Sequence, residues 1–200
     1  MDARPIGVFD SGLGGLTVVR ELRRELPRES IVYFGDIARL PYGTKSGSQI
    51  RRFSLENTKF LLRQGIKALV IACNSSSSAA YLFLKRRFSL PMVSVIEPAV
   101  EECLQKTRSG KVGVIGTSAT IESRVYEEAL HRQGKRIQVI AQSCPLFVPL
   151  VEEGWLDASA HGCGSPPVVL ASAACRTGLF GAPGQCLGHL GLPPRPEPRR

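Results

Sequence analysis

The sequence predicts an α/β protein built on parallel sheets. Two observations lead to this prediction: short apolar segments rich in β-branched residues recur along the first 157 residues, and amphipathic segments of helical length separate them. Strands that are apolar throughout are buried on both faces, which is typical of a parallel sheet covered by helices. A chain of 200 residues is also long enough to bury a sizeable core.

Six segments are expected to be strands, because each is short, apolar and rich in β-branched residues. In chain order they are Ile6–Asp10, Ile31–Asp36, Ala68–Asn74, Met92–Glu97, Lys111–Thr117 and Ile137–Ser143. Amphipathic segments between them are expected to be helices. These are Leu16–Leu26, Gln49–Gln64, Ala79–Phe88 and Ala119–Gln133, with a further helix around Cys103 and another from Pro145, whose missing N–H is harmless in a first turn.

The composition changes near residue 158. Residues 159–200 contain half of the 14 prolines of the chain and no Lys, Ile, Asn, Tyr, Trp, Met or Asp. Such a segment buries too little apolar surface to offset its chain entropy, so it is expected to be mostly irregular. Only Val168–Ala174 has the pattern of a strand or short helix. A natural tail is one interpretation; a frame change, splice variant or sequence error is the other, and we favour it.

Charge and cysteine spacing exclude several classes of function. The net charge of +9 comes from Lys and Arg scattered on helix faces beside Glu, so solvated faces explain it better than a nucleic-acid partner does. No apolar run is long enough for a membrane span, and no signal peptide is recognisable, so a cytoplasmic protein is expected. The six cysteines and three histidines lack zinc-ligand spacing, so no metal is expected.

Polar residues follow the predicted strands at their carboxyl ends, which meet at one edge of a parallel sheet and bind ligands there. Asp10 and Ser11 follow the first strand, and Cys73 and Asn74 end the third. Cys73 is either an inert buried thiol or a reactive one, since a helix beginning behind it would favour the thiolate. Asp10 would then relay or orient a proton, or would only cap the first helix.

The remaining candidates have simpler explanations. The glycine loop at 12–15 either makes a tight turn or binds an anionic group through its N–H groups. Cys103 and Cys144 are interpreted as packing residues.

Five sequence motifs in order resemble those of bacterial glutamate racemases. They are GVFDSGLGGLTV (7–18), YFGD with LPYG (33–36, 40–43), IACNS (71–75), VIGTSAT (114–120) and CPLFVPLVEEG (144–154). The resemblance covers residues 5–157. It implies two flavodoxin-like parallel-sheet domains with the active site between them: residues 1–98 as the first, 99–158 as an incomplete second, and 159–200 as the irregular tail.

The resemblance also implies a reaction. Members of this family are isomerases that interconvert L- and D-glutamate, and the D form enters peptidoglycan, the cell-wall polymer on which cell shape depends. They use no pyridoxal phosphate, other cofactor or metal, and a homodimer is compatible with the family. Two thiols on opposite faces of the substrate exchange its α-proton, because a single base tends to return the proton to the face from which it came.

Residue roles follow from the same resemblance. Cys73 is implied as the first catalytic thiol, Asp10 as its assistant and Glu152 as the assistant of the second thiol. Ser75 stands where members usually carry threonine, and the hydroxyl is kept. The residues implied to hold the substrate are Asp10, Ser11, Pro41, Tyr42, Gly43, Asn74, Ser75, Thr117 and Thr120.

One departure from the family is serious. The second thiol of the family belongs to a Gly-Cys-Thr-His motif about thirty residues beyond Glu152, and neither Cys163 nor Cys186 stands in such a motif. This chain is therefore expected to be impaired or inactive as a racemase. The alternatives are a racemase of a related acid such as aspartate or a hydantoin, a non-catalytic binding or inhibitor protein, for instance of gyrase, and an unstable fragment.

Overall fold

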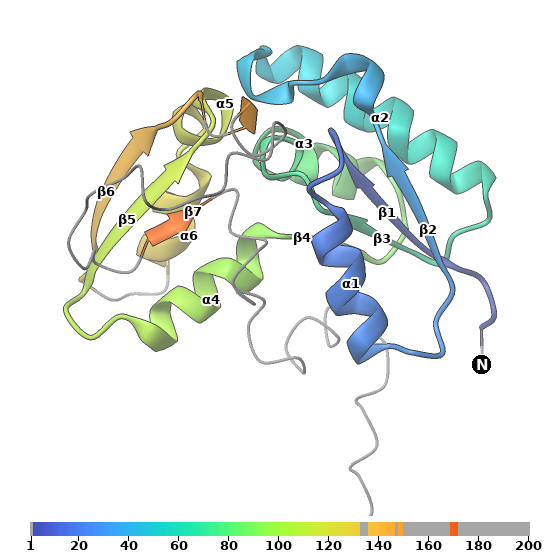
Figure 1. Ribbon diagram of the computed structural model, residues 1–200, viewed down its shortest axis with the longest axis horizontal. Coiled ribbons are helices and arrows are strands. Elements are labelled where there is room, and N and C mark those ends of the chain that lie inside the picture. Colours follow the sequence, from blue (N-terminus) through green and yellow to red (C-terminus); the bar gives the residue numbers. More distant parts are fainter. Residues whose placement is uncertain (1, 133–135, 147, 150–168, 172–200) are drawn as a thin grey trace, which may run out of the picture.

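The computed structural model describes residues 2–132, 136–146, 148–149 and 169–171 and contains two parallel sheets (Figure 1). The first has the order β2 (Ile31–Gly35), β1 (Ile6–Asp10), β3 (Ala68–Ile71) and β4 (Met92–Ser94). The second has the order β6 (Gln138–Ser143), β5 (Lys111–Gly116) and β7 (Val169–Ala171). Every described pair of strands is parallel, so the predicted fold class is confirmed.

Helices cover both faces of the first sheet. Helix α1 (Leu16–Glu25) lies on one face, and α2 (Gly47–Arg63) and α3 (Asn74–Arg87) lie on the other (Figure 1). Strand β1 shows why its sequence is apolar throughout: Val8 joins the core cluster that contains Val18 of α1, whereas Phe9 joins the one that contains Leu61 of α2. Each face of the sheet thus buries its own set of side chains.

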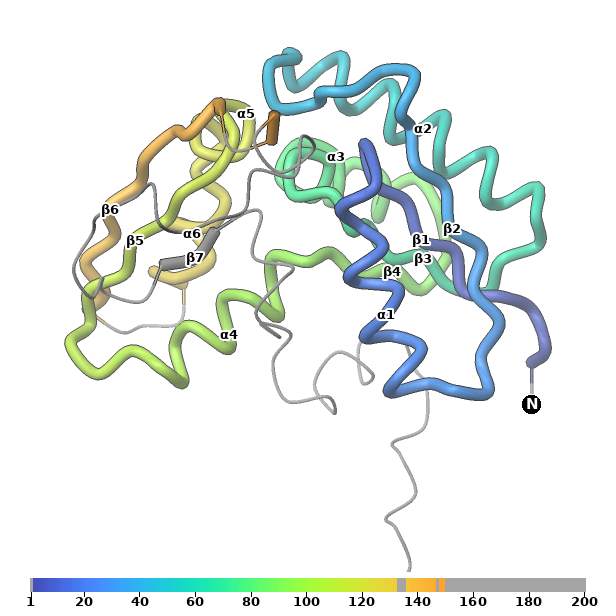
Figure 2. Tube along the Cα trace, in the orientation of Figure 1, coloured from blue at the N-terminus to red at the C-terminus, as the bar shows by residue number. Residues whose placement is uncertain are grey.

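Helix α4 (Ile96–Lys106) carries the chain from the first sheet to the second (Figure 2). There Cys103 and Val100 of α4 share a core cluster with Val112 of β5 and Leu130 of α6 (Val125–Arg132). Helix α5 (Ser118–Glu122) follows β5 directly. Cys103 is therefore a buried core residue, as its sequence context indicated.

Several element boundaries differ from the predicted ones. Strand β3 ends at Ile71 and α3 begins at Asn74, so the predicted strand runs three residues too far. The helix predicted for 119–133 is two helices, α5 and α6, separated at Arg124, whose φ is 54°. Most residues avoid that left-handed region, so a helix is interrupted there. Strand β7 lies within Val168–Ala174, the one part of 159–200 with a regular pattern.

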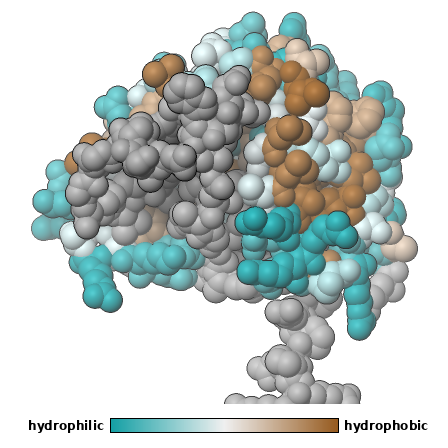
Figure 3. Space-filling model, in the orientation of Figure 1, coloured by the Kyte–Doolittle hydropathy of each residue, from teal (hydrophilic) through white to brown (hydrophobic). Residues whose placement is uncertain are grey.

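The division into domains 1–98 and 99–158 stays a prediction, and its boundary falls inside α4. The helix predicted from Pro145 lies largely outside the described residues. No helix in the described ranges is long and apolar enough to cross a membrane. On the face shown in Figure 3, apolar atoms gather at the upper right, above a hydrophilic band.

Candidate active site

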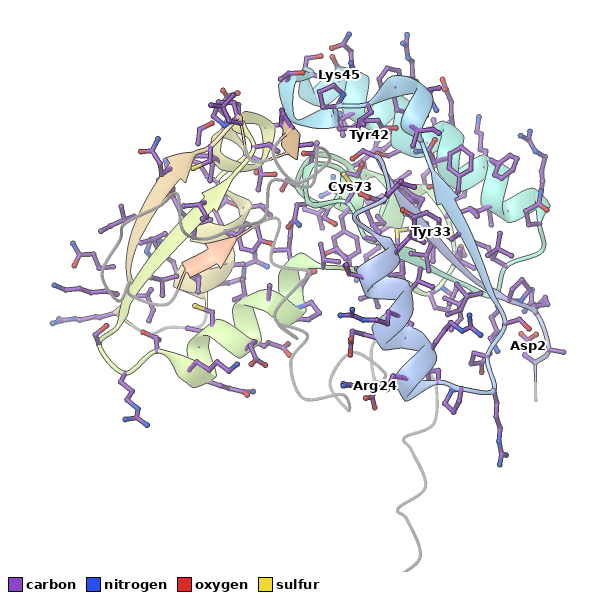
Figure 4. All side chains as sticks on the ribbon, viewed as in Figure 1. Asp2, Arg24, Tyr33, Tyr42, Lys45 and Cys73 are labelled. Atoms are coloured by element: carbon purple, nitrogen blue, oxygen red, sulfur yellow. The ribbon has the colours of Figure 1, made fainter. Side chains whose placement is uncertain are left out.

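The carboxyl ends of β1 and β3 bring Asp10, Ser11 and Cys73 together. The two strands are paired in parallel, with Phe9 opposite Ile71, and the N–H of Ala72 donates to the carbonyl of Phe9 at 2.9 Å. The residues that follow on each strand are therefore neighbours. Figure 4 shows Cys73 near the middle of the molecule, between Tyr42 and Tyr33.

Cys73 is the N-cap residue of α3. Its sulfur accepts a hydrogen bond from the backbone N–H of Ser76 at 3.5 Å, and its thiol donates to Ser11 Oγ at 3.4 Å. The side chain is only 5% exposed. The sulfur thus replaces the oxygen that usually caps a helix, and it faces the first N–H groups of α3.

The N-terminus of α3 favours the thiolate of Cys73, but burial and a neighbouring charge oppose it. Burial raises the pKa of the Cys73 thiol, and the negative charge of Asp10 raises it further. The hydrogen bonds that Cys73 makes with Ser11 and Ser76 lower the pKa, but burial outweighs them. The surroundings of Cys73 therefore favour its thiol form overall, whereas the Ser76 N–H of α3 acts in the direction of the thiolate, as expected from the helix behind Cys73.

Asp10 interacts both with the glycine loop that precedes α1 and with Cys73. One carboxylate oxygen, Oδ2, accepts the backbone N–H of Gly15 at 2.8 Å, at the N-terminus of α1. The same buried carboxylate acts electrostatically on Cys73. A Cβ atom at Gly15 would lie 2.6 Å from Asp10 Cβ, so only glycine allows this close approach.

The loop after β2 holds Tyr42 with its side chain turned into the protein. It consists of two short helices, η1 (Ile37–Arg39) and η2 (Tyr42–Thr44), with exposed Pro41 as the N-cap of η2. The Tyr42 hydroxyl donates to Asp36 and accepts from Asn57 Nδ2 at 3.1 Å. Burial and the Asp36 charge raise the pKa of Tyr42. What Tyr42 and Gly43 can offer a ligand is therefore their backbone.

Hydroxyl groups link this site to the second sheet. Ser75 Oγ lies 3.0 Å from Thr117 Oγ1, which lies 3.1 Å from Thr120 Oγ1, and all three side chains are buried. A Cβ atom at Gly43 would lie 2.5 Å from the Thr117 side chain. The Tyr126 hydroxyl of α6 donates to Asn74 Oδ1 at 2.6 Å. Residues that precede α4 in the chain and residues that follow β5 thus lie together around the start of α3.

The structure gathers most of the residues predicted for the site, although Glu152 lies outside the described residues. Two residues of this region were not singled out from the sequence. Tyr126 belongs to a polar helix pattern that gives no sign of its contact with Asn74, whereas Ser76 stands in the serine run behind Cys73. Within the described ranges, no group of three His, Cys, Asp or Glu side chains could hold a metal ion.

Comparisons with known proteins agree with this geometry. The family model of Asp/Glu/Hydantoin racemase matches residues 6–159. The glutamate racemase of Geobacter metallireducens is 51% identical over 157 residues, which make up 78% of this chain and 58% of that relative. The chain thus spans less than two thirds of the length of this curated relative.

Solved structures of glutamate racemases are also similar. The enzyme from Bacillus anthracis matches with a TM-score of 0.79 and 34% identity, over 86% of this chain and 78% of the other. The enzyme from Francisella tularensis, in complex with D-glutamate, matches with a TM-score of 0.73 and 45% identity, over 79% of this chain and 59% of the other.

Proposed function

This chain belongs to the Asp/Glu/hydantoin racemase family, and we propose that it forms one catalytic half of a glutamate racemase. In this proposal Cys73 exchanges the α-proton on one face of glutamate. The observation that carries the proposal is the position of the Cys73 sulfur, at the N-terminus of α3 and hydrogen-bonded to Ser11, with Asp10 acting on it electrostatically. The substrate is proposed from the names of the relatives.

Asp10 is proposed to assist the proton transfer. In the thiol form Cys73 is a proton donor, and as the thiolate it is the base that removes the α-proton. A nearby carboxylate favours the thiol, so it opposes loss of the proton to solvent and makes the thiolate a stronger base. The same pair therefore serves both directions of the exchange.

The substrate is proposed to bind between Cys73 and the hydroxyl chain, which consists of the hydrogen-bonded side chains of Ser75, Thr117 and Thr120. Backbone N–H groups at the beginning of η2 and α3 have no partner within their own helices and suit a carboxylate. The proposed contacts are the backbone N–H groups of Tyr42 and Gly43 and the backbone carbonyl of Pro41, together with the side chains of Ser11, Asn74, Ser75, Thr117 and Thr120. Fixed N–H and hydroxyl dipoles of this kind stabilise the negative charge that develops when the α-proton leaves.

Inversion requires a second proton donor on the opposite face, and the chain lacks the motif that provides it in the family. Glu152 is proposed as a residue that would assist that donor in a complete enzyme. This chain is therefore proposed to exchange the α-proton of one enantiomer with solvent, with little or no conversion to the other.

Incubation with L- or D-glutamate in deuterated water, followed by NMR, tests the proposal. We expect the α-proton of one enantiomer to be replaced by deuterium with retention of configuration. Cys73→Ser should abolish the exchange, because a hydroxyl is a much weaker acid than a thiol. The matched control is Cys103→Ala, which removes a buried thiol in the core of the second sheet.

Two results would contradict the proposal. Exchange that persists in Cys73→Ser would remove the thiol from the mechanism. Conversion of either enantiomer into the other at comparable rates would show that a second proton donor is present. Exchange with aspartate in preference to glutamate would instead favour the related-acid alternative.

A further inference from the structure

We propose that Ser76 is a positioning residue for the Cys73 sulfur, directing both its backbone N–H and its side-chain hydroxyl at the thiolate when the thiol ionises. This inference rests on the proposed role of Cys73 as a proton-transfer group. It assigns to a second serine in the helix the task of holding the charge that this role creates.

The four consecutive serines at 75–78 differ in their hydrogen bonding. Three of their hydroxyls have hydrogen-bond partners: Ser75 Oγ lies 3.0 Å from Thr117 Oγ1, Ser77 Oγ donates to the Ile71 carbonyl at 3.1 Å, and Ser78 Oγ donates to the Asn74 carbonyl at 2.8 Å. Within the described structure, Ser76 Oγ is fully buried and has no such partner.

A buried hydroxyl without a partner is costly, so its position calls for an acceptor that appears at some stage. Ser76 is three residues beyond the N-cap Cys73, and its N–H already reaches the sulfur at 3.5 Å. A hydrogen bond from its side chain would lower the pKa of the Cys73 thiol, which is the direction that stabilises the thiolate. The acceptor is therefore the Cys73 sulfur.

Ionisation of the Cys73 thiol gives the Ser76 hydroxyl a strong hydrogen-bond acceptor. The neutral thiol donates a hydrogen bond to Ser11 Oγ at 3.4 Å, and a thiol sulfur is only a weak hydrogen-bond acceptor. Once the proton has left, the sulfur carries a negative charge and accepts strongly. The hydroxyls of Ser11 and Ser76 can then both turn their protons toward it, in addition to the N–H of Ser76. Three donors would hold a charge that burial and Asp10 oppose.

The test is the pH dependence of alkylation of Cys73 by iodoacetamide in Ser76→Ala, measured on the Cys73 peptide by mass spectrometry. Alanine keeps the backbone N–H and suits a helix, and it removes only the hydroxyl. We expect the rate at pH 7.5 to fall about tenfold, as hydrogen bonds to charged groups predict, and the half-maximal rate to move to higher pH.

Ser54→Ala is the matched control, because Ser54 in α2 is the other fully buried hydroxyl without a partner in the described structure. Its pH profile should equal that of the original chain. An unchanged profile in Ser76→Ala, with circular dichroism showing the same fold, would overturn the inference. Because alkylation needs no substrate, this result is independent of whether Cys73 exchanges the α-proton of glutamate.

Discussion

Cys73 and Asp10 are buried in the same site, and the charge of the carboxylate opposes that of the thiolate. Replacing Asp10 by Asn removes this charge and keeps an oxygen that can accept the N–H of Gly15. We therefore expect Asp10→Asn to lower the pKa of Cys73 and to speed its alkylation at pH 7.5 by roughly 3- to 10-fold. The exchange of the glutamate α-proton should nevertheless become slower, because the thiolate is then a weaker base.

The control for this prediction is Asp2→Asn. Asp2 is paired with Arg4 at the surface, and Figure 4 shows it far from Cys73. Its replacement should leave the alkylation rate unchanged. Slower alkylation in Asp10→Asn would contradict the assigned direction of the charge effect.

Because the Cys73 thiol is buried, the free energy of unfolding is expected to change with pH in the alkaline range. Because the folded state raises the pKa of Cys73, the unfolded chain loses this thiol proton first as the pH rises. The contribution of Cys73 to the free energy of unfolding is fully present below the ordinary pKa of a thiol. It is lost as the pH rises through the raised pKa of Cys73 in the folded state. Tyr42 acts in the same direction at higher pH.

Urea unfolding between pH 7.5 and pH 10.5 measures this effect. The free energy of unfolding should decrease with pH, and Cys73→Ala should decrease less steeply than the original chain. Equal slopes for the two proteins would contradict the prediction. A constant difference between them would reflect only the packing of the sulfur.

The site residues were most predictable from the sequence where a polar or thiol side chain stands directly at the end of an apolar strand. The position of Cys73 after an apolar strand predicted its place beside Asp10 and Ser11. The pattern left open whether Cys73 is an inert buried thiol or a reactive one, because it reveals the helix behind Cys73 but not the extent of its burial. The contact of Tyr126 with Asn74 joins residues 52 positions apart, and no local pattern reports it.

Among the elements, the contact between η2 and the start of α5 is unusually close. A methyl group at Gly43 would lie 2.5 Å from Thr117 Cβ and Cγ2, so the two segments would have to separate. We expect Gly43→Ala to destabilise the fold by about 1–3 kcal/mol, as overpacking does. Thermal and urea unfolding measure this loss.

Gly47→Ala provides the comparison for Gly43→Ala. Gly47 is the first residue of α2, and a methyl group there would only approach the flexible end of Arg51, at 3.4 Å. Alanine favours a helix over glycine, so stability should stay equal or rise by up to about 1 kcal/mol. A similar loss in both variants would show that the contact with Thr117 is not the cause.

The helices and strands themselves were largely predictable, because each buries a continuous apolar stripe or run. Their ends were less so. Ala72 and Cys73 continue the apolar sequence of β3, yet the strand ends at Ile71 and α3 begins at Asn74. Similarly, Ile96 is apolar but belongs to α4. An apolar residue at the end of a run can continue a strand or begin a buried helix, and only the surrounding packing decides between them.

For the molecule as a whole, β6 forms one edge of the described second sheet, and Ile140 on it is 60% exposed. Edge strands with exposed apolar side chains promote association between chains. We expect Ile140→Lys to reduce concentration-dependent association, measured by light scattering and sedimentation velocity. The free energy of unfolding should change by less than about 0.5 kcal/mol, as at other surface positions.

Val139 on the same strand is the contrasting position. It packs against the core cluster of the second sheet, so Val139→Lys should destabilise the fold. Unfolding caused equally by Ile140→Lys would mean that the exposed and inward faces of β6 are assigned wrongly.

The two sheets together show what a sequence pattern conveys about a whole molecule. The repeated strand and helix segments predicted parallel sheets, and family motifs predicted two of them. The partner of β5 on its second side is β7, from residues 169–171, which follows a long interval in the sequence. Only spatial proximity reveals such a pairing, since the apolar segment 168–174 is compatible with a strand or a helix.

The hydroxyl chain from Ser75 through Thr117 to Thr120 has no fixed polarity, because in each contact either oxygen can be the donor. Rotating the three O–H bonds in concert reverses the direction of the dipoles, and no heavy atom has to move. The junction between the sheets can therefore present a lone pair or a proton at the Ser75 end. The direction of the dipoles at this junction can therefore reverse by movement of hydrogen atoms alone, in an otherwise rigid structure.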